Sequence, residues 1–191
     1  MSELVEVRWH GRGGQGAKTA SYILAVAAAE QGWKVQAFPE YGAERRGAPM
    51  KSYVRISDGP LRLRSAVKEP SVVVVLDSTL ILGENIAAGV PDDGIILVNG
   101  TEDPAALKQR LGVAPTVRVG VVDATAIANE CIGRPIPNTP MLGALAKLSD
   151  VVSLEAAQAS VRKMLGKKLA PAVIEGNIKA LERAYQEVKV A

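Results

Sequence analysis

A glycine cluster near the start of the chain has the spacing of a phosphate-binding turn. Residues 11–16, Gly-Arg-Gly-Gly-Gln-Gly, contain the G-x-G-x-x-G pattern between an alternating, strand-like segment (5–9) and an alanine-rich helical segment (17–31). Because glycine has no Cβ, backbone amides there can approach an anion at the positive end of the helix. The favoured alternative is a structural turn pressed against a neighbour, with Gln15 bridging two amides across an interface.

A dinucleotide site needs more than this turn. An acidic residue near the end of the second strand must bind a ribose hydroxyl. Residues 35–38 are typical of that second strand, which ends at Phe38 and Pro39, so Glu40 comes one position late. The missing acid weakens the dinucleotide interpretation.

The loop between Pro39 and Pro49 is expected to leave the same sheet edge as the glycine turn and to face the same cleft. Its Arg45 and Arg46 could pair with phosphate in fork geometry. Glu40 and Glu44 would offset them or meet basic residues of a partner. The alternative is a solvated charged loop.

The chain offers no recognisable catalytic set. Asp77 and Asp123 each follow an apolar strand, at the edge where ligands bind in parallel sheets, but both precede helical segments, so capping is favoured over catalysis. His10 adjoins the glycine turn, yet no local motif places a carboxylate or nucleophile beside it. Cys131 is expected to be a small core residue. We therefore assign no catalytic residues.

A proline-punctuated segment, residues 135–145, is rigid and then turns helical. Asn138 or Thr139 is expected to cap this helix, with Pro140 in its first turn. Either polar side chain could also contact a ligand.

Composition excludes several classes of protein. The 191 residues carry a formal charge of only +3 and are 4% aromatic, so a nucleic-acid partner is not expected. One cysteine and one histidine cannot form a disulfide or a zinc site, so no metal site is expected. The acidic N-terminus does not resemble a signal peptide, and no apolar run is long enough for a membrane span. We expect one domain over residues 1–191 and a cytoplasmic location.

The pattern of elements predicts an α/β fold. Apolar runs at 72–76, 95–98 and 117–122 are typical of buried parallel strands, and 5–9 with 35–38 predicts a βαβ unit. Residues 50–56 and 61–64 alternate on either side of a turn, which predicts an antiparallel hairpin. We therefore expect an open, mostly parallel, twisted Rossmann-like sheet with helices on both faces and an antiparallel edge hairpin.

Two further helices are expected near the C-terminus. Ser153 can cap a helix ending near Leu165, and Pro171 suits the first turn of the next. The last helix carries an apolar stripe that should pack on the chain's own sheet or, alternatively, dock on another subunit. The stripe comprises Ile174, Ile178, Leu181, Tyr185 and Val188.

Three motifs, in this order, resemble the gamma subunit of pyruvate or 2-oxoacid:ferredoxin oxidoreductase. They are residues 8–18 (RWHGRGGQGAK), 39–45 (PEYGAER) and 137–143 (PNTPMLG). The resemblance covers essentially the whole chain and is more specific than the glycine pattern alone.

The resemblance implies a non-catalytic subunit with a role in assembly. The family's alpha and beta subunits hold thiamine diphosphate and magnesium, and its delta subunit holds iron–sulfur clusters. The complete enzyme decarboxylates a 2-oxoacid oxidatively, reduces ferredoxin and forms acyl-coenzyme A. The residues in these motifs look most like those of the pyruvate branch of the family. The isolated chain could also self-associate as a homodimer.

If the chain contacts coenzyme A, the resemblance points to particular residues. Gly13, Gly14, Gln15 and Gly16 would supply backbone contacts, and Arg45 or Arg46 would reach phosphate. Asn138 and Thr139 are second choices. No cofactor is expected to bind tightly to this chain alone. The competing functions are an independent dinucleotide-dependent oxidoreductase and a scaffold without enzyme partners.

Overall fold

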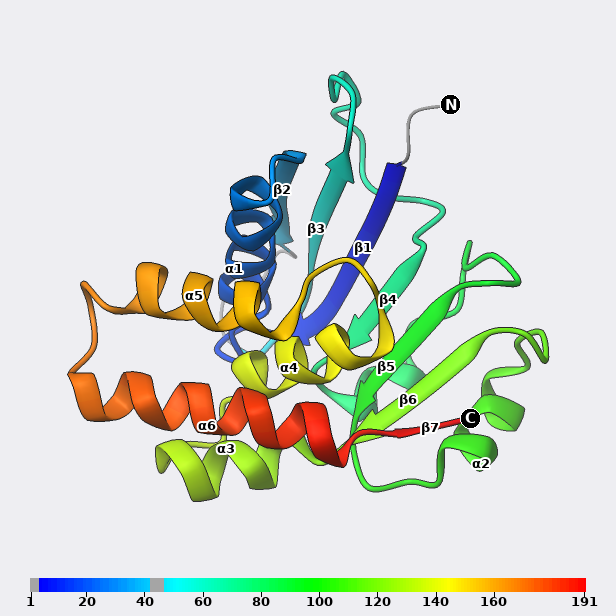
Figure 1. Cartoon of the computed structure of the whole chain (residues 1–191). Coiled ribbons are helices and arrows are strands. Elements are labelled where there is room, and N and C mark those ends of the chain that lie inside the picture. Colours follow the sequence, from blue (N-terminus) through cyan, green and yellow to red (C-terminus); the bar gives the residue numbers. More distant parts are fainter. Residues whose placement is uncertain (1–3, 42–46) are drawn as a thin grey trace.

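The computed structural model describes residues 4–41 and 47–191. Its strands form one seven-stranded sheet in the order β2-β3-β1-β4-β5-β6-β7 (Figure 1). The strands are β1 (Leu4–Arg12), β2 (Lys34–Tyr41), β3 (Pro49–Ser57), β4 (Val72–Val75), β5 (Ile95–Asn99), β6 (Arg118–Val122) and β7 (Lys189–Val190). The helices are α1 (Ala17–Glu30), the 3-10 helix η1 (Ser78–Leu82), α2 (Pro104–Leu111), α3 (Ala124–Ile132), α4 (Asn138–Leu148), α5 (Leu154–Leu165) and α6 (Pro171–Glu187).

The predicted fold class is confirmed. Strand β1 pairs in parallel with β4, β4 with β5, and β5 with β6. Strand β3 is antiparallel to both β1 and β2, so β2 runs in the same direction as β1 but is separated from it by one strand. The predicted βαβ unit is therefore right in strand direction, because β1 and β2 run the same way. It is wrong in pairing, because β3 lies between them.

The edge hairpin exists, but the strands that form it are β2 and β3. Residues 61–64 were expected to pair with 50–56, yet they are not a strand. The buried guanidinium of Arg55 instead binds the backbone carbonyls of Leu63 and Ser65, at 3.4 and 2.7 Å, and holds this stretch as an irregular loop. Strand β2 continues through Pro39 to Tyr41, which an edge strand tolerates because one side of it needs no ladder bonds.

Helices cover both faces of the sheet, but unequally. One core joins Val7, Trp9 and other sheet residues to α1, α3, α4, α5 and α6. A smaller core on the opposite face joins β4, β5 and β6 to Leu80 of η1, Ile86 and Leu107 of α2. On that second face, β1 and β3 carry buried polar residues, among them Arg8, His10 and Arg55, and loop segments supply carbonyls to the two arginines.

The last helix packs on other helices. Ile174, Ile178 and Leu181 of α6 are buried, and α6 lies against α4 and α3 (Figure 1). The contact with α4 is close, because a Cβ at Gly143 would lie 2.0 Å from the carbonyl oxygen of Leu181. The expectation that this stripe packs within the chain is correct, but its main partner is α4 and not the sheet.

Side-chain caps fix several of the helix starts. Ser153 accepts a hydrogen bond from the amide of Ala156, and Pro171 stands in the first turn of α6, as predicted. Asp77 and Asp123 cap η1 and α3, accepting from Thr79 and Ala126. The predicted cap of α4 is wrong: its N-cap is Pro137, without a side-chain cap bond.

The search for membrane spans within residues 4–41 and 47–191 finds no helix that is both long and apolar enough to cross a bilayer.

Candidate functional site

The candidate site is a polar crevice at the carboxyl edge of the sheet. From β1 the chain continues to β2 and β3 on one side and to β4, β5 and β6 on the other, so the strand order reverses between β1 and β4, where open α/β sheets bind ligands. The crevice begins beside this point, at Gln15, and extends over the ends of β4, β5 and β6. It encloses about 300 Å³. Its lining comes from the glycine turn, from the ends of three strands and from the segment before α4, and includes Gln15, Asp77, Asn99, Asp123, Thr125 and Pro137.

The glycine turn forms one wall of this site. Gly14 and Gly16 have φ angles of 106° and 84°, which strain any residue with a Cβ. Gly13 exchanges backbone hydrogen bonds with Gly47 and Ala48, so the return of the 39–49 loop lies against the turn, as expected. Within the described residues, no acceptor meets the amides of Gly14 and Gly16. These two N–H groups are available to an anion at the start of α1.

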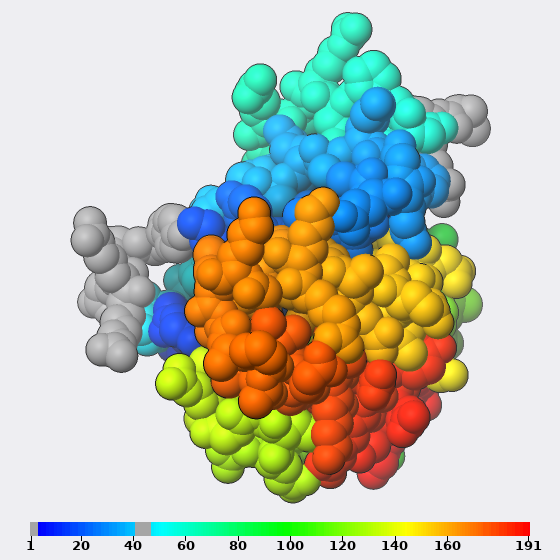
Figure 2. Space-filling model, turned by 60° about the vertical axis from the view of Figure 1, so that its left-hand side comes forward, coloured from blue at the N-terminus to red at the C-terminus, as the bar shows by residue number. Residues whose placement is uncertain are grey.

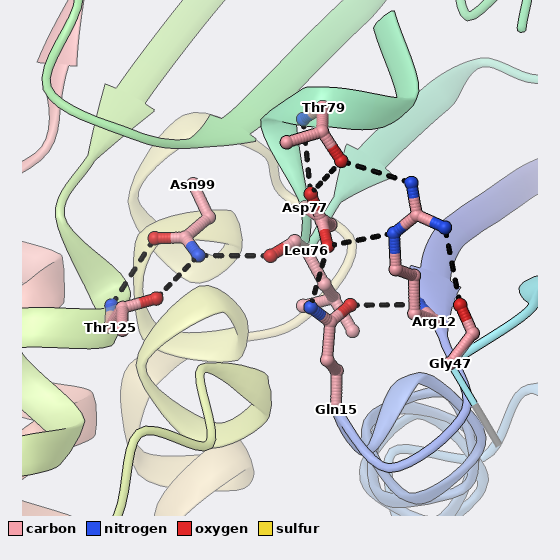
Figure 3. A network of polar contacts seen from close by, with 8 residues as sticks. All are labelled: Arg12, Gln15, Gly47, Leu76, Asp77, Thr79, Asn99 and Thr125. Atoms are coloured by element: carbon pink, nitrogen blue, oxygen red, sulfur yellow. Dashed lines mark hydrogen bonds and ion pairs between the residues drawn. The ribbon is translucent and has the colours of Figure 1, made fainter. Parts of the chain in front are cut away.

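The side chain of Gln15 is used inside the chain. Its Oε1 accepts from the amide of Arg12 at 2.7 Å, and its Nε2 donates to Asp77 at 2.8 Å (Figure 3). It therefore closes the turn onto β4. The expected contact of Gln15 across an interface stays a prediction.

Arg12 lies across the mouth of the crevice. Its guanidinium donates to Asp77 at 3.2 Å, to the hydroxyl of Thr79 at 3.1 Å and to the carbonyl of Gly47 at 3.1 Å (Figure 3). One cation thus ties β1 to η1 and to the returning loop. Sequence reasoning did not single it out, although its place inside the glycine motif was a signal.

Asp77 is held as a carboxylate. Burial alone would raise its pKa, but hydrogen bonds from Thr79 and Gln15 and the charge of Arg12 outweigh that effect and leave the pKa lowered. The negative charge is therefore present, and partly neutralised, at neutral pH.

The next two strand ends are joined by a buried amide. Asn99 Nδ2 donates to the Leu76 carbonyl at 2.9 Å and to the Thr125 hydroxyl at 2.8 Å, while its Oδ1 accepts from the Thr125 amide (Figure 3). Asn99 was not predicted as a site residue, although it directly follows the apolar run at residues 95–98. It fixes the spacing of β4, β5 and α3.

Asn138 and Thr139 lie beneath the turn. A Cβ on Gly16 would lie 2.6 Å from Asn138 Nδ2, so only glycine lets this amide pack over the start of α1. Thr139, 1% exposed, donates to Asn177 of α6 at 2.8 Å. Asn138 therefore joins the predicted glycine site, whereas Thr139 is turned toward α6.

His10 has partners that sequence alone could not reveal. Its Nδ1 lies 3.0 Å from Glu84, and its Nε2 accepts from Arg8 at 3.0 Å. Because Arg8 donates to Nε2, the ring must be neutral, with its proton on Nδ1. Burial first, and then the charge of Arg8, lower the pKa of His10 to about 4. The ring faces away from the crevice side of the turn, among the polar residues of the second sheet face, and Lys51 completes the cluster at 3.1 Å from Glu84.

The remaining predicted site residues, Arg45 and Arg46, lie outside the described residues. In the described part of the chain, the crevice is lined by Gln15 of the glycine turn and by two carboxylates, Asp77 and Asp123. Those carboxylates cap helices, since Asp77 accepts from the amide and hydroxyl of Thr79 and Asp123 accepts from the amide of Ala126. The arrangement offers polar side chains that can bind and position a group.

Comparison with known proteins agrees with the motifs. The family model described as pyruvate ferredoxin/flavodoxin oxidoreductase matches residues 6–187. The chain is 54% identical over 184 residues to pyruvate synthase subunit PorC of Thermotoga maritima, covering 96% of this chain and 94% of the relative. It is 44% identical to the pyruvate/ketoisovalerate oxidoreductases common subunit gamma of Thermococcus kodakarensis, covering 98% of each.

A solved structure shows the same fold over the whole length. The crystal structure of the pyruvate oxidoreductase subunit PORC from Thermotoga maritima matches with a TM-score of 0.86 and 49% identity, covering 99% of each chain. The chain therefore belongs to the pyruvate ferredoxin/flavodoxin oxidoreductase family, and within it is a gamma-type subunit.

Proposed function

We propose that this chain is the non-catalytic gamma subunit of a cytoplasmic pyruvate (2-oxoacid):ferredoxin oxidoreductase. The complete enzyme would decarboxylate the 2-oxoacid, reduce ferredoxin and form acyl-coenzyme A. The observation that carries the proposal is the similarity to pyruvate oxidoreductase subunits along nearly the full length of both chains.

The proposal assigns the redox cofactors to partner subunits. With a single cysteine, the chain cannot supply the four thiolates that an iron–sulfur cluster usually requires. Thiamine diphosphate and magnesium would lie in alpha and beta subunits, and the clusters in a delta subunit. This chain would contribute to assembly and to the shape of the coenzyme A site.

An anionic part of coenzyme A would bind at the glycine wall of the crevice. The amides of Gly14 and Gly16, for which residues 4–41 and 47–191 supply no acceptor, favour a phosphate at the start of α1. The floor does not, because Asp77 and Asp123 would repel it. Phosphate is therefore expected at the glycine turn and not beside the two carboxylates.

An independent dinucleotide enzyme is a poorer fit to this geometry. The only acid near the end of β2, within the described residues, is Glu40, which accepts a hydrogen bond from Tyr53. Because β3 separates β2 from β1, Glu40 is two strands away from the glycine turn. A ribose bound at the turn would not reach it.

A glycine substitution tests the coenzyme A contact in the assembled enzyme. Gly14→Ala has space, because nothing lies within 4 Å of the new Cβ, but its φ of 106° forces the backbone to shift and misdirects the turn amides. Loss of one hydrogen bond to a phosphate would raise the KM for coenzyme A about tenfold, while kcat and the KM for pyruvate stay near wild type.

The matched control is Gly112→Ala, which also has a positive φ, 62°, and open space, but stands at the end of α2. An unchanged KM for coenzyme A in Gly14→Ala, or an equal rise in both variants, would refute the contact.

Co-purification through a tag on this chain tests the subunit assignment separately. Partner subunits containing thiamine and iron–sulfur should be recovered, whereas a chain recovered alone with bound dinucleotide would favour the independent oxidoreductase.

A further inference from the structure

A second hollow lies away from the crevice, where α3, α5 and α6 meet. It encloses about 230 Å³ between the end of α3, residues 133–137 and the turn that joins α5 to α6. Figure 2 looks onto this side of the molecule, where the orange surface of α5 and α6 adjoins the yellow-green surface of α3. Its walls are mainly aliphatic and comprise Ile132, Ile136, Leu165, Leu169 and Val173. Leu169 is 39% exposed, so apolar surface is open to solvent at the rim.

Two buried asparagines also line this hollow. Asn177 is satisfied inside the chain, because its Nδ2 donates to Val173 and its Oδ1 accepts from Thr139. Asn138, 9% exposed, accepts from the amide of Thr139 through Oδ1, but the described residues supply no acceptor for its Nδ2. The Nδ2 atom packs against Gly16 at the start of α1, so the aliphatic side chains, and not the asparagines, give this hollow its character.

The rim is basic. Arg134 lines the hollow, and Lys167 and Lys168 stand in the turn between Leu165 and Leu169. Within residues 4–41 and 47–191, no carboxylate forms an ion pair with any of the three. Two cations in the last turn of α5 differ, since Arg162 pairs with Glu175 and Lys163 with Glu30. Uncompensated positive charge therefore gathers around this one apolar opening.

We propose that this hollow docks a segment of a partner subunit, which inserts one bulky apolar side chain while flanking acidic residues face Arg134, Lys167 and Lys168. The inference rests on the proposed function, because it requires a partner subunit. An apolar pocket surrounded by polar residues is the usual anatomy of an interface hot spot. The volume suits a single side chain better than a whole ligand, whose pockets are usually about 300 Å³ or larger.

Photo-cross-linking tests where the segment binds. The variant Leu169→p-benzoylphenylalanine, in the full tagged chain co-produced with its partner subunits, should capture a peptide with an apolar residue flanked by acids. The same photo-reactive residue at Leu63, which is 52% exposed on another loop, is the control and should not capture that peptide. Capture of a second copy of this chain, or an assembled complex without any cross-link at 169, would overturn the inference.

Charge reversal tests the complementarity. Arg134→Glu/Lys167→Glu/Lys168→Glu should lower the amount of complex recovered with this chain at least tenfold. The matched control Arg62→Glu/Arg64→Glu/Lys68→Glu makes the same charge change on another exposed loop and should stay within twofold of wild type. Equal loss in both variants, or no loss in either, would contradict the docking site. If even the wild-type chain recovers no partner subunit, the proposed function itself fails.

Discussion

Asp77 holds the candidate site together, so its removal should cost more than the loss of a helix cap. In Asp77→Ala, η1 loses its cap bond from Thr79, worth about 1 kcal/mol. The bond from Gln15, at 2.8 Å, adds about 1 kcal/mol. The pair with Arg12 is 35% exposed on the arginine side, so screening limits it to less than about 1 kcal/mol. The free energy of unfolding should fall by about 2–3 kcal/mol.

Urea unfolding of the isolated chain, followed by circular dichroism, measures this loss. The control is Asp103→Ala, because Asp103 is an exposed carboxylate that caps α2 through Ala106 and has no bond to the glycine turn. It should lose only about 1 kcal/mol. Because the folded pKa of Asp77 is lowered from 3.8, its contribution is fully present above pH 4 and is lost as the pH falls further. Equal losses in the two variants at pH 7 would refute the site role of Asp77.

Two further predictions concern the polar face and the helix contact. Because the folded pKa of His10 is about 4 and its ordinary value is 6.5, acidification from pH 6.5 to 4 should destabilise the chain by about 3 kcal/mol. His10→Gln should flatten that pH dependence of the unfolding free energy, and an unchanged slope would contradict the neutral ring. Gly143→Ala places a Cβ 2.0 Å from a backbone oxygen of α6, so unfolding in urea should show a loss of about 3 kcal/mol or more. Gly83→Ala, in open space, is its control, and similar stability in both would show that the helix contact yields easily.

Local sequence signals predicted the parts of the fold that depend on local chemistry. The buried strands, the cap at Ser153 and the proline start of α6 all follow from residues next to one another. The hairpin was misassigned because Leu61 and Leu63 alternate like a strand. The conformation of residues 61–65 depends instead on the buried guanidinium of Arg55 in β3, which donates hydrogen bonds to the carbonyls of Leu63 and Ser65.

The candidate site was predictable in place but not in detail. The glycine spacing located the turn, and strand ends located Asp77 and Asp123. The contacts that organise it join distant residues, such as Gln15 with Asp77 and Asn99 with Thr125. His10 and Glu84, 74 positions apart, likewise meet only because β1 and the segment after η1 pack together. Such pairs depend on tertiary packing, which periodicity and capping rules do not describe.

The central claim is that this chain works as a subunit of a 2-oxoacid oxidoreductase, and one measurement tests it most directly. The complex purified through a tag on this chain is assayed for pyruvate-dependent, coenzyme A-dependent reduction of ferredoxin, beside the same partner subunits produced without the chain. The account predicts activity that co-purifies with the tag and is lost when the chain is absent. Full activity from the partner subunits alone, or a tagged chain without partners and activity, would contradict it.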